Sequence, residues 1–304
     1  MCGIVGIASN KPVSINIINS LKKLEYRGYD SAGIATIKNE FIKEKKCSGR
    51  VEELEKILFK SPSDGITGIG HVRWATHGIP NTINAHPHSS ENVSVVHNGI
   101  IENSDELKKN LTSKGLKFKS QTDTEVITLL ITESLKTHKP REAVFETLKK
   151  LKGSFALGII FKNHSDIIIG ARRGSPLAVG YSKEENYLGS DSYALKSMTN
   201  KISYLDDGEL CVLTKDTVNF YDTNQKKINK KIHIVSDEEN ITDKGDYKNF
   251  MSKEIHEQPI TAKKCVSEYI DNLKKDINIY NFPIEPKKIK KIILVGCGTA
   301  YHSC

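Results

Sequence analysis

The sequence predicts an α+β domain of largely antiparallel sheets with helices on their outer faces, and three features of the chain agree on it. Short apolar strands and amphipathic helices alternate from the N-terminus to about residue 220. Beyond residue 151 the strand patterns follow one another with few helices between them, as antiparallel neighbours do. A hydrophobic fraction of 38% and a charged fraction of 27% are typical of a soluble globular protein.

The N-terminal third contains two kinds of apolar pattern, one typical of helices and one typical of strands. Apolar residues at i, i+1, i+4 and i+7 predict a helix over residues 14–26, with Ser14 as its N-cap. A second helix is expected at Val51–Lys60. Short apolar runs predict strands over residues 4–8, 33–37, 68–72 and 93–97.

The middle of the chain carries two helix-start signals. Thr122 and Glu125 have the spacing of a capping box ahead of an apolar helix over residues 126–135. Pro140 is expected to open a further helix that runs to about residue 151, because proline suits the first helical position. Downstream, strands are predicted over residues 155–161, 167–171 and several short segments up to residue 220.

The rest of the chain is expected to form a linker and the start of another domain. Lys, Asn and Asp dominate residues 221–249, and an amphipathic helix is expected over residues 251–273. Residues 292–295 form an apolar run typical of a buried parallel strand, ahead of a Gly-rich turn. We therefore predict a first domain over residues 2–220, a linker over 221–285 and the start of a second domain over 286–304.

Charge and cysteine usage exclude several classes of protein. The 45 Lys and Arg against 37 Asp and Glu leave a formal charge of +8. The surplus is scattered lysine without interleaved aromatics, so nucleic-acid binding is not expected. The six cysteines show no CxxC pair and no spacing typical of a metal site, and we expect neither metal nor cofactor. Without an apolar run of roughly 18 residues or a secretory signal, we expect a cytoplasmic protein with reduced thiols and no membrane contact.

The second residue offers a candidate nucleophile. Removal of Met1, which is favoured before a small residue, would leave Cys2 with a thiol and a free α-amine on one residue. An α-amine has an unperturbed pKa of about 7.7–8.0, so it could act as a base near neutral pH. The plain alternative is a small residue ahead of a buried strand, and the opening hexapeptide alone supports both interpretations equally.

Further polar residues lie at the expected ends of strands and helices. Alone, Arg73 has the character of a surface charge, Asn98 and Gly99 that of a hairpin turn, and Asp123 that of a helix cap. A shared function is indicated only because all of them lie at strand ends or loops that could surround one nucleophile, Cys2.

In combination these motifs resemble those of the class II glutamine amidotransferases, whose glutaminase domain is an N-terminal-nucleophile hydrolase. CGIVG at residues 2–6 matches their start, and LEYRGYDSAG at 24–33 and RWATHG at 73–78 resemble the isomerising branch that acts on fructose 6-phosphate. The likeness is dense through residue 220 and resumes with KEIHEQP at 253–259 and GCGTAYHS at 296–303. It implies a four-layer αββα sandwich, followed by a linker and an incomplete α/β sugar isomerase segment.

The resemblance implies a role for each motif residue. Cys2 would attack the side-chain amide of L-glutamine, and Asn98 with the backbone N–H of Gly99 would form the oxyanion hole. Arg73 would hold the glutamine α-carboxylate and Asp123 its α-ammonium group. The other implied residues are Thr76 and His77 in the same pocket, Trp74 in a loop that gates ammonia away from water, and Arg27 and Asp30 as supports around the nucleophile.

The same resemblance assigns Thr299 and Ser303 to the start of a sugar-phosphate site, where hydroxyls and backbone N–H groups at a helix N-terminus would bind phosphate. The residues that would open and isomerise the sugar are absent, so we expect a shortened product, one part of a split gene, or a remnant. Conversion of fructose 6-phosphate to glucosamine 6-phosphate would then need lobes supplied by another chain. A homo-oligomer and a complementing polypeptide both stay open.

Three other interpretations stay open from the sequence. An amidotransferase acting on phosphoribosyl pyrophosphate shares the N-terminal Cys, but its motifs differ from residues 24–33 and 73–78. A non-catalytic module that binds glutamine or a partner chain would follow if Met1 is retained, because the free amine of Cys2 would be lost. A translated fragment without function is the third, because an apolar strand left without neighbours promotes aggregation.

Overall fold

The computed structural model describes residues 2–235, 246–267, 269–271, 276–277, 284–296 and 301–302. The chain divides into two compact units, Met1–Ile241 and Thr242–Cys304. The candidate site lies in the first unit. The second unit is described by itself below.

Two sheets form the centre of the first unit, and all their described strand pairs are antiparallel. One has eight strands in the order β15-β11-β9-β10-β1-β4-β2-β3, and the other has seven in the order β14-β13-β12-β8-β7-β6-β5. The strands of the first sheet are β1 (Gly3–Ala8), β2 (Ser31–Lys38), β3 (Phe41–Ser48), β4 (Thr67–Arg73), β9 (Ala178–Tyr181), β10 (Asn186–Gly189), β11 (Lys201–Tyr204) and β15 (His233–Ile234). Those of the second are β5 (His88–Ser89), β6 (Val93–Ile101), β7 (Gly153–Phe161), β8 (His164–Arg173), β12 (Leu210–Leu213), β13 (Val218–Tyr221) and β14 (Lys227–Ile228).

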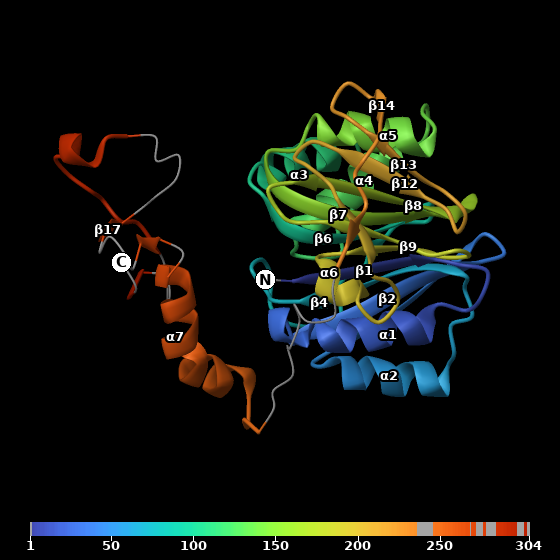
Figure 1. Ribbon diagram of the computed structural model, residues 1–304. Coiled ribbons are helices and arrows are strands. Elements are labelled where there is room, and N and C mark those ends of the chain that lie inside the picture. The colour runs from blue at the N-terminus through green and yellow to red at the C-terminus, as the bar shows by residue number, and fades with distance from the viewer. Residues whose placement is uncertain are drawn as a thin grey trace. The chain divides into compact units, whose positions relative to one another are not determined.

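Helices cover the outer face of each sheet, so the first unit has four layers (Figure 1). The first sheet carries α1 (Ser14–Lys23) and α2 (Val51–Lys60), and the second carries α3 (Ser104–Ser113), α4 (Thr124–Ser134) and α5 (Pro140–Leu148). Two short helices, η1 (Glu25–Arg27) and α6 (Ser192–Leu195), lie beside the first sheet. This arrangement is the predicted αββα sandwich, and Pro140 opens α5 as expected.

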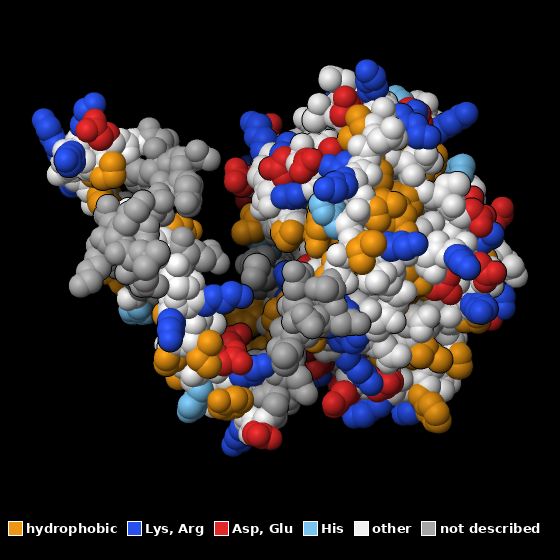
Figure 2. All heavy atoms as spheres, viewed as in Figure 1, with side chains coloured by type: hydrophobic (Ala, Val, Ile, Leu, Met, Phe, Trp, Pro, Cys, Tyr) orange, Lys and Arg blue, Asp and Glu red, His pale blue; other side chains and the backbone are white. Residues whose placement is uncertain are grey.

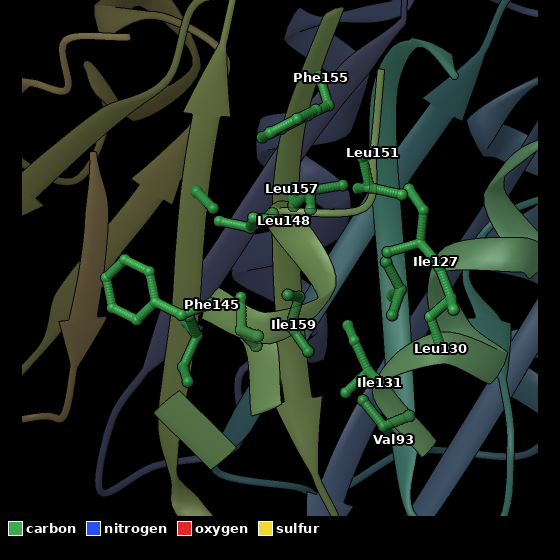
Figure 3. Packing of buried hydrophobic residues seen from close by; sticks show 14 of the residues in the cluster. Val93, Ile127, Leu130, Ile131, Phe145, Leu148, Leu151, Phe155, Leu157 and Ile159 are labelled. Carbon is green, nitrogen blue, oxygen red and sulfur yellow. The ribbon is translucent and has the colours of Figure 1, made fainter. Parts of the chain in front are cut away.

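Three hydrophobic clusters join these layers. The central cluster lies between the sheets and contains Ile4, Val96 and Leu188 from three different strands. A second cluster packs α1 and α2 on the first sheet. In the third, Ile127 and Ile131 of α4 point toward the apolar face of β6 and β7 (Figure 3). Burying each large apolar side chain contributes about 1.5–3 kcal/mol, so the clusters hold the strand ends that carry the site in place.

The capping box predicted at Thr122 and Glu125 is wrong. The N-cap of α4 is Asp123, and its side chain makes no capping hydrogen bond. The carboxylate of Glu125 accepts a hydrogen bond from the backbone N–H of Lys119 at 2.8 Å. The hydroxyl of Thr122 bonds Nε2 of His88 at 2.9 Å. Tertiary and loop contacts therefore use both side chains in place of the local cap.

Ser14 is likewise not a cap. The N-cap position of α1 is Val13, and the hydroxyl of Ser14 donates to the carbonyl of Ser63. The helix predicted over residues 14–26 ends at Lys23 and continues as the separate 3₁₀ turn η1. The sequence analysis did not predict β3 or α3, and the polar stretch after residue 221 adds the short edge strands β14 and β15.

The second unit contains one long helix, α7 (Phe250–Ser267), which ends before the predicted limit at residue 273. A two-residue ladder of β16 (Ile270–Asp271) and β17 (Asp276–Ile277) follows, and then the 3₁₀ turn η3 (Pro286–Lys288). The strand predicted over residues 292–295 is wrong, since residues 291–296 have no regular structure and Val295 is 88% exposed. An apolar strand needs neighbouring strands to pair its backbone, and no strand among the described residues pairs with this run.

The surface of the visible face mixes both signs of charge. Figure 2 shows lysine and arginine side chains interspersed with aspartate and glutamate over this face. In the part of the chain that the structure describes, no helix combines the length and apolar character needed to cross a membrane.

Candidate active site

Cys2 lies directly before β1, a central strand of the first sheet. Gly3 pairs with Val72 of β4, which brings Cys2 to the loop that follows β4. The backbone N–H of Trp74 donates to the Sγ atom of Cys2 at 3.3 Å. Burial raises the pKa of the Cys2 thiol above its usual value, and this hydrogen bond opposes the rise by favouring the thiolate.

Asn98 lies inside β6 rather than in a hairpin turn, so the local interpretation of the Asn98-Gly99 pair is wrong. Its Nδ2 donates to the carbonyl of Cys2 at 2.9 Å and to the hydroxyl of Ser190 at 3.0 Å. The same hydroxyl accepts a hydrogen bond from the backbone N–H of Ile4 at 2.6 Å. Ser190 therefore joins the start of β1 to the side chain of Asn98.

Gly99 adopts a backbone conformation that favours glycine, with φ at +137°. A Cβ atom at this position would lie 2.1 Å from the carbonyl oxygen of Ser154 in β7. The close approach of two strands and the positive φ both require glycine here. They also give the peptide of Gly99 a defined orientation beside the pocket.

Arg73 is the last residue of β4 and is only 3% exposed. Its guanidinium donates to the backbone carbonyls of His77, Gly78 (3.2 Å) and Ile79 (3.5 Å). These acceptors are neutral, and no described carboxylate forms an ion pair with the Arg73 guanidinium. The local reading of Arg73 as a surface charge is therefore wrong.

Asp30 fixes the loop after Arg73 through a hydrogen bond to its backbone. The Asp30 carboxylate accepts hydrogen bonds from the backbone N–H of Ala75 and, at 2.9 Å, from the hydroxyl of Ser31. Trp74, in the same loop, is 48% exposed and packs edge-on against Tyr29 at a centroid distance of 5.7 Å. Asp30 thus positions the backbone that contacts the thiol.

Arg27 stands farther from the thiol, in η1. It forms an ion pair with Asp191, which directly follows Ser190. The second oxygen of Asp191 accepts from the backbone N–H of Ala194 at 2.8 Å and so caps α6. Arg27 therefore holds the segment that carries Ser190.

Asp123 closes the other side of the site. Its Oδ2 atom accepts a hydrogen bond from the backbone N–H of Ile101 at 2.8 Å, and the residue is 7% exposed. No ion pair to Asp123 exists among the described residues. The ring of His97 is nearby: burial lowers the pKa of His97, while the Asp123 carboxylate opposes this.

A small pocket that is partly open to solvent joins these groups. It is lined by Cys2 and Gly99 and by all the residues predicted to bind glutamine, namely Arg73, Trp74, Thr76, His77 and Asp123. Asn98, Arg27 and Asp30 do not line it: Asn98 contacts the backbone of Cys2, while Arg27 and Asp30 hold neighbouring segments. Thr299 and Ser303 lie outside the described residues.

Sequence reasoning missed the roles of Ser190 and of a group of buried histidines at the pocket. His71 precedes Arg73 in β4 and is completely buried, and His86 and His97 line the pocket. A polar residue within an otherwise apolar strand pattern was the available signal for His71 and His97. Ser190 had no local signal, because its partners are far away in the sequence. Among the described residues no group of His, Cys, Asp and Glu could hold a metal ion.

Comparisons with known proteins agree with this geometry. The sequence profile of the glutamine amidotransferase domain matches residues 72–197. The chain is 47% identical, over 99% of its length, to a glutamine–fructose-6-phosphate aminotransferase (isomerising) of Mesorhizobium japonicum, and covers 50% of that protein. It is 45% identical, over 100% of its length, to the enzyme of the same name from Bradyrhizobium diazoefficiens, again covering 50%. The chain thus spans about half the length of the curated relatives it matches.

Solved structures extend the likeness to the fold. A glutamine phosphoribosylpyrophosphate amidotransferase of B. subtilis, complexed with ADP and GMP, is 26% identical with a TM-score of 0.64, over 74% of this chain and 50% of that one. A glutamine aminotransferase class-II domain protein of Silicibacter pomeroyi, at 13% identity and a TM-score of 0.53, covers 73% of this chain and 99% of its own and supports the fold alone. The chain therefore carries a match to the glutamine amidotransferase domain and is similar, over its whole length, to isomerising glutamine–fructose-6-phosphate aminotransferases.

Proposed function

We propose that the first unit hydrolyses L-glutamine to L-glutamate and ammonia, with Cys2 as the nucleophile after removal of Met1. One observation carries the proposal. A buried guanidinium and a buried carboxyl group, neither with an ionic partner among the described residues, line the same pocket as the thiol of Cys2.

Buried charges are normally paired, because removing an ion from water is expensive. Arg73 contacts only neutral carbonyl groups, and Asp123 accepts from one backbone N–H. The α-carboxylate and α-ammonium groups of a free amino acid would supply the two missing partners. The planar guanidinium of Arg73 suits a carboxylate, which it can bind through two parallel hydrogen bonds.

The side-chain amide of such an amino acid would meet the thiol. In the proposed reaction the α-amine of Cys2 takes the thiol proton, the Sγ atom bonds to the amide carbon, and the proton passes to the departing ammonia. Water then cleaves the thioester and releases L-glutamate. The lining of one pocket by a buried guanidinium, a buried carboxyl group and the thiol supports glutamine as the substrate.

The negative oxygen that forms during attack needs hydrogen-bond donors. We assign this role to the side chain of Asn98 and the backbone N–H of Gly99. Both hydrogens of the Asn98 amide are engaged in this structure, so the oxyanion would replace the hydroxyl of Ser190 as one partner. Ser190 can release that contact, because its hydroxyl also accepts from the backbone N–H of Ile4.

The remaining predicted residues take supporting roles in this proposal. Thr76 and His77 would contact the amino-acid head group, and Trp74, exposed on its loop, would limit the escape of ammonia to water. Asp30 would hold that loop and Arg27 the segment of Ser190.

The fate of the ammonia is a further part of the proposal. The names of the curated relatives support transfer to fructose 6-phosphate, giving glucosamine 6-phosphate. Thr299 and Ser303 would then form part of the sugar-phosphate site. We place this reaction in the cytoplasm, and the free thiols of Cys47 and Cys211 support a reducing compartment.

Glutamine turnover by the purified chain tests the proposal. We expect equal amounts of glutamate and ammonia from L-glutamine, a mature N-terminus at Cys2 by mass spectrometry, and no amino sugar when fructose 6-phosphate is added. Cys2→Ala should abolish turnover and keep the fold. Cys265→Ala, which removes an exposed thiol of α7, is the matched control and should keep full activity.

Three results would contradict the proposal. Near-normal turnover in Cys2→Ala would remove Cys2 from the mechanism. A retained Met1 in an active protein would exclude the free amine as base. Amino sugar formed by this polypeptide alone would show that the chain does more than the glutaminase step.

A further inference from the structure

Four buried histidines, His71, His86, His88 and His97, lie at the pocket or next to residues that line it, and the proposed reaction gives them no role. His71 and His86 meet edge to face at a ring-centroid distance of 4.1 Å, and His86 and His88 do so at 4.8 Å. Burial lowers the pKa of His71 to about 3 and those of His86 and His88 well below their usual value. Each neutral ring therefore has one N–H donor and one bare nitrogen that can only accept.

The direction of the hydrogen bonds starts from His71. Its Nε2 atom lies 2.9 Å from the backbone carbonyl of His97 and 3.1 Å from the side-chain oxygen of Asn98. A carbonyl oxygen can only accept, so Nε2 of His71 must carry the hydrogen. The Nδ1 atom of a neutral His71 is then bare.

The same reasoning fixes the hydrogen positions of His86, Thr124 and His97. The Nδ1 atom of His86 lies 3.2 Å from the bare Nδ1 of His71, so His86 must donate there and keep a bare Nε2. The hydroxyl of Thr124 donates to that Nε2 at 2.8 Å. It accepts in turn from Nδ1 of His97 at 2.9 Å. The Nε2 atom of His97 ends the chain. No partner meets hydrogen-bond geometry at this buried atom, although the nearby Ser154 backbone favours the charged ring and opposes the fall in the pKa of His97.

This chain determines which way the amide of Asn98 faces. His71 donates to the amide oxygen, and the amide nitrogen donates to the carbonyl of Cys2 at 2.9 Å. The Cys2 carbonyl can only accept a hydrogen bond, so the amide group that faces it must be the NH₂ group. The contact with His71 and the contact with Cys2 therefore each require the same orientation of the Asn98 amide. A flipped amide would turn its oxygen toward the Cys2 carbonyl and its NH₂ group toward the N–H of His71.

We propose that His71 is a positioning residue that keeps the amide N–H of Asn98 on the side of the nucleophile, and that the chain through His86, Thr124 and His97 holds His71 in the required tautomer. The inference rests on the proposed function, because it matters for catalysis only if Asn98 stabilises the oxyanion. His71 touches neither the thiol nor the pocket and acts through Asn98 alone.

Nitrogen-15 NMR of the unmodified protein, labelled in its imidazole rings, tests the tautomers without any assay of activity. We expect the hydrogen of His71 on Nε2 and those of His86 and His97 on Nδ1. A hydrogen on Nδ1 of His71 would overturn the proposal. This measurement also decides the matter if a substituted chain does not fold.

Two substitutions then separate positioning from packing. His71→Leu removes the donor, and we expect kcat to fall roughly 10- to 100-fold, as for partial loss of an oxyanion donor, with the Kd of L-glutamate within about 3-fold of the original. His71→Gln keeps an N–H donor and should recover most of the loss. His88→Gln is the control, since His88 is also buried, bonds Thr122 and makes no described contact with Asn98.

Unchanged kcat in His71→Leu, or equal loss in both His71 variants, would refute the role. If the unmodified chain shows the expected tautomers but releases no ammonia from glutamine, the proposed function fails, and the positioning role fails with it. An active chain with the opposite tautomer, by contrast, removes only the role of His71.

Discussion

The replacement Asn98→Ala tests the oxyanion hole, because the structure separates its effect on stability from its effect on rate. The side chain is 8% exposed and makes three hydrogen bonds, to Cys2, Ser190 and His71. After truncation His71 still donates to the carbonyl of His97, and Ser190 still accepts from Ile4. The carbonyl of Cys2, in contrast, loses the hydrogen bond that it accepts from the Asn98 side chain.

The loss of neutral hydrogen bonds predicts a fall in the free energy of unfolding of about 1–3 kcal/mol. The effect on rate should be larger. Loss of one oxyanion donor lowers kcat by about 10²–10³, or roughly 2.7–4 kcal/mol of transition-state stabilisation. KM should change little, because the negative oxygen exists only after attack has begun.

Asn186→Ala provides the matched control. Asn186 is 3% exposed, and its Nδ2 donates to the carbonyls of Thr214 at 2.8 Å and Lys215 at 3.1 Å, away from the pocket. Denaturant unfolding should show similar losses of stability for both variants, while release of ammonia from glutamine falls only in Asn98→Ala. A kcat within about 3-fold of the original in Asn98→Ala, or equal loss of activity in both variants, would refute the reasoning.

Three more outcomes are expected. Gly99→Ala should destabilise the fold strongly in urea titrations, because its Cβ would lie 2.1 Å from the Ser154 carbonyl at a φ of +137°; normal stability would contradict the strand geometry. Arg73→Lys should raise KM for glutamine about 10- to 100-fold with a smaller change in kcat, because a lysine cannot bind a carboxylate through two parallel bonds; an unchanged KM would exclude Arg73 from binding. Burial lowers the pKa of His71 from 6.5 to about 3, so between these values the unfolded chain binds a proton that the folded chain does not. The free energy of unfolding should therefore fall as pH drops through that window, by up to about 1.4 kcal/mol per pH unit, and equal stability at pH 7 and pH 5 would contradict a buried neutral ring.

Elements with a strong local pattern were predicted well. Val51–Lys60 has the same bounds in the sequence analysis and in the structure, and Pro140 opens α5. Both depend on periodicity or backbone chemistry within one or two turns of helix. The helix caps predicted at Ser14 and at Thr122 with Glu125 were wrong, because other contacts use these side chains. The hydroxyl of Ser14 bonds Ser63 in a distant segment, and the carboxylate of Glu125 bonds the loop directly before its helix, in place of the predicted caps.

The apolar run at residues 292–295 failed for a related reason. A buried strand is defined by the strands that pair with it, and these residues have none in the structure. Their composition predicted only that they would suit such a place. β3 went unnoticed for the opposite reason, since its alternation of lysine and glutamate with few apolar residues hid a strand whose pairing with β2 runs from Ser31 to Lys38.

The sequence by itself determined the chemistry available to the site. A cysteine at the second position, an arginine after one strand and an aspartate before one helix were all readable, because the resemblance of their motifs is local. Tertiary structure alone decided how these groups are held. The hydroxyl of Ser190 bonds Ile4 across a separation of 186 residues, and the amide of Asn98 bonds Cys2 across 96. Local periodicity carries no information about such contacts, because they form only when two sheets pack face to face and bring distant strand ends together.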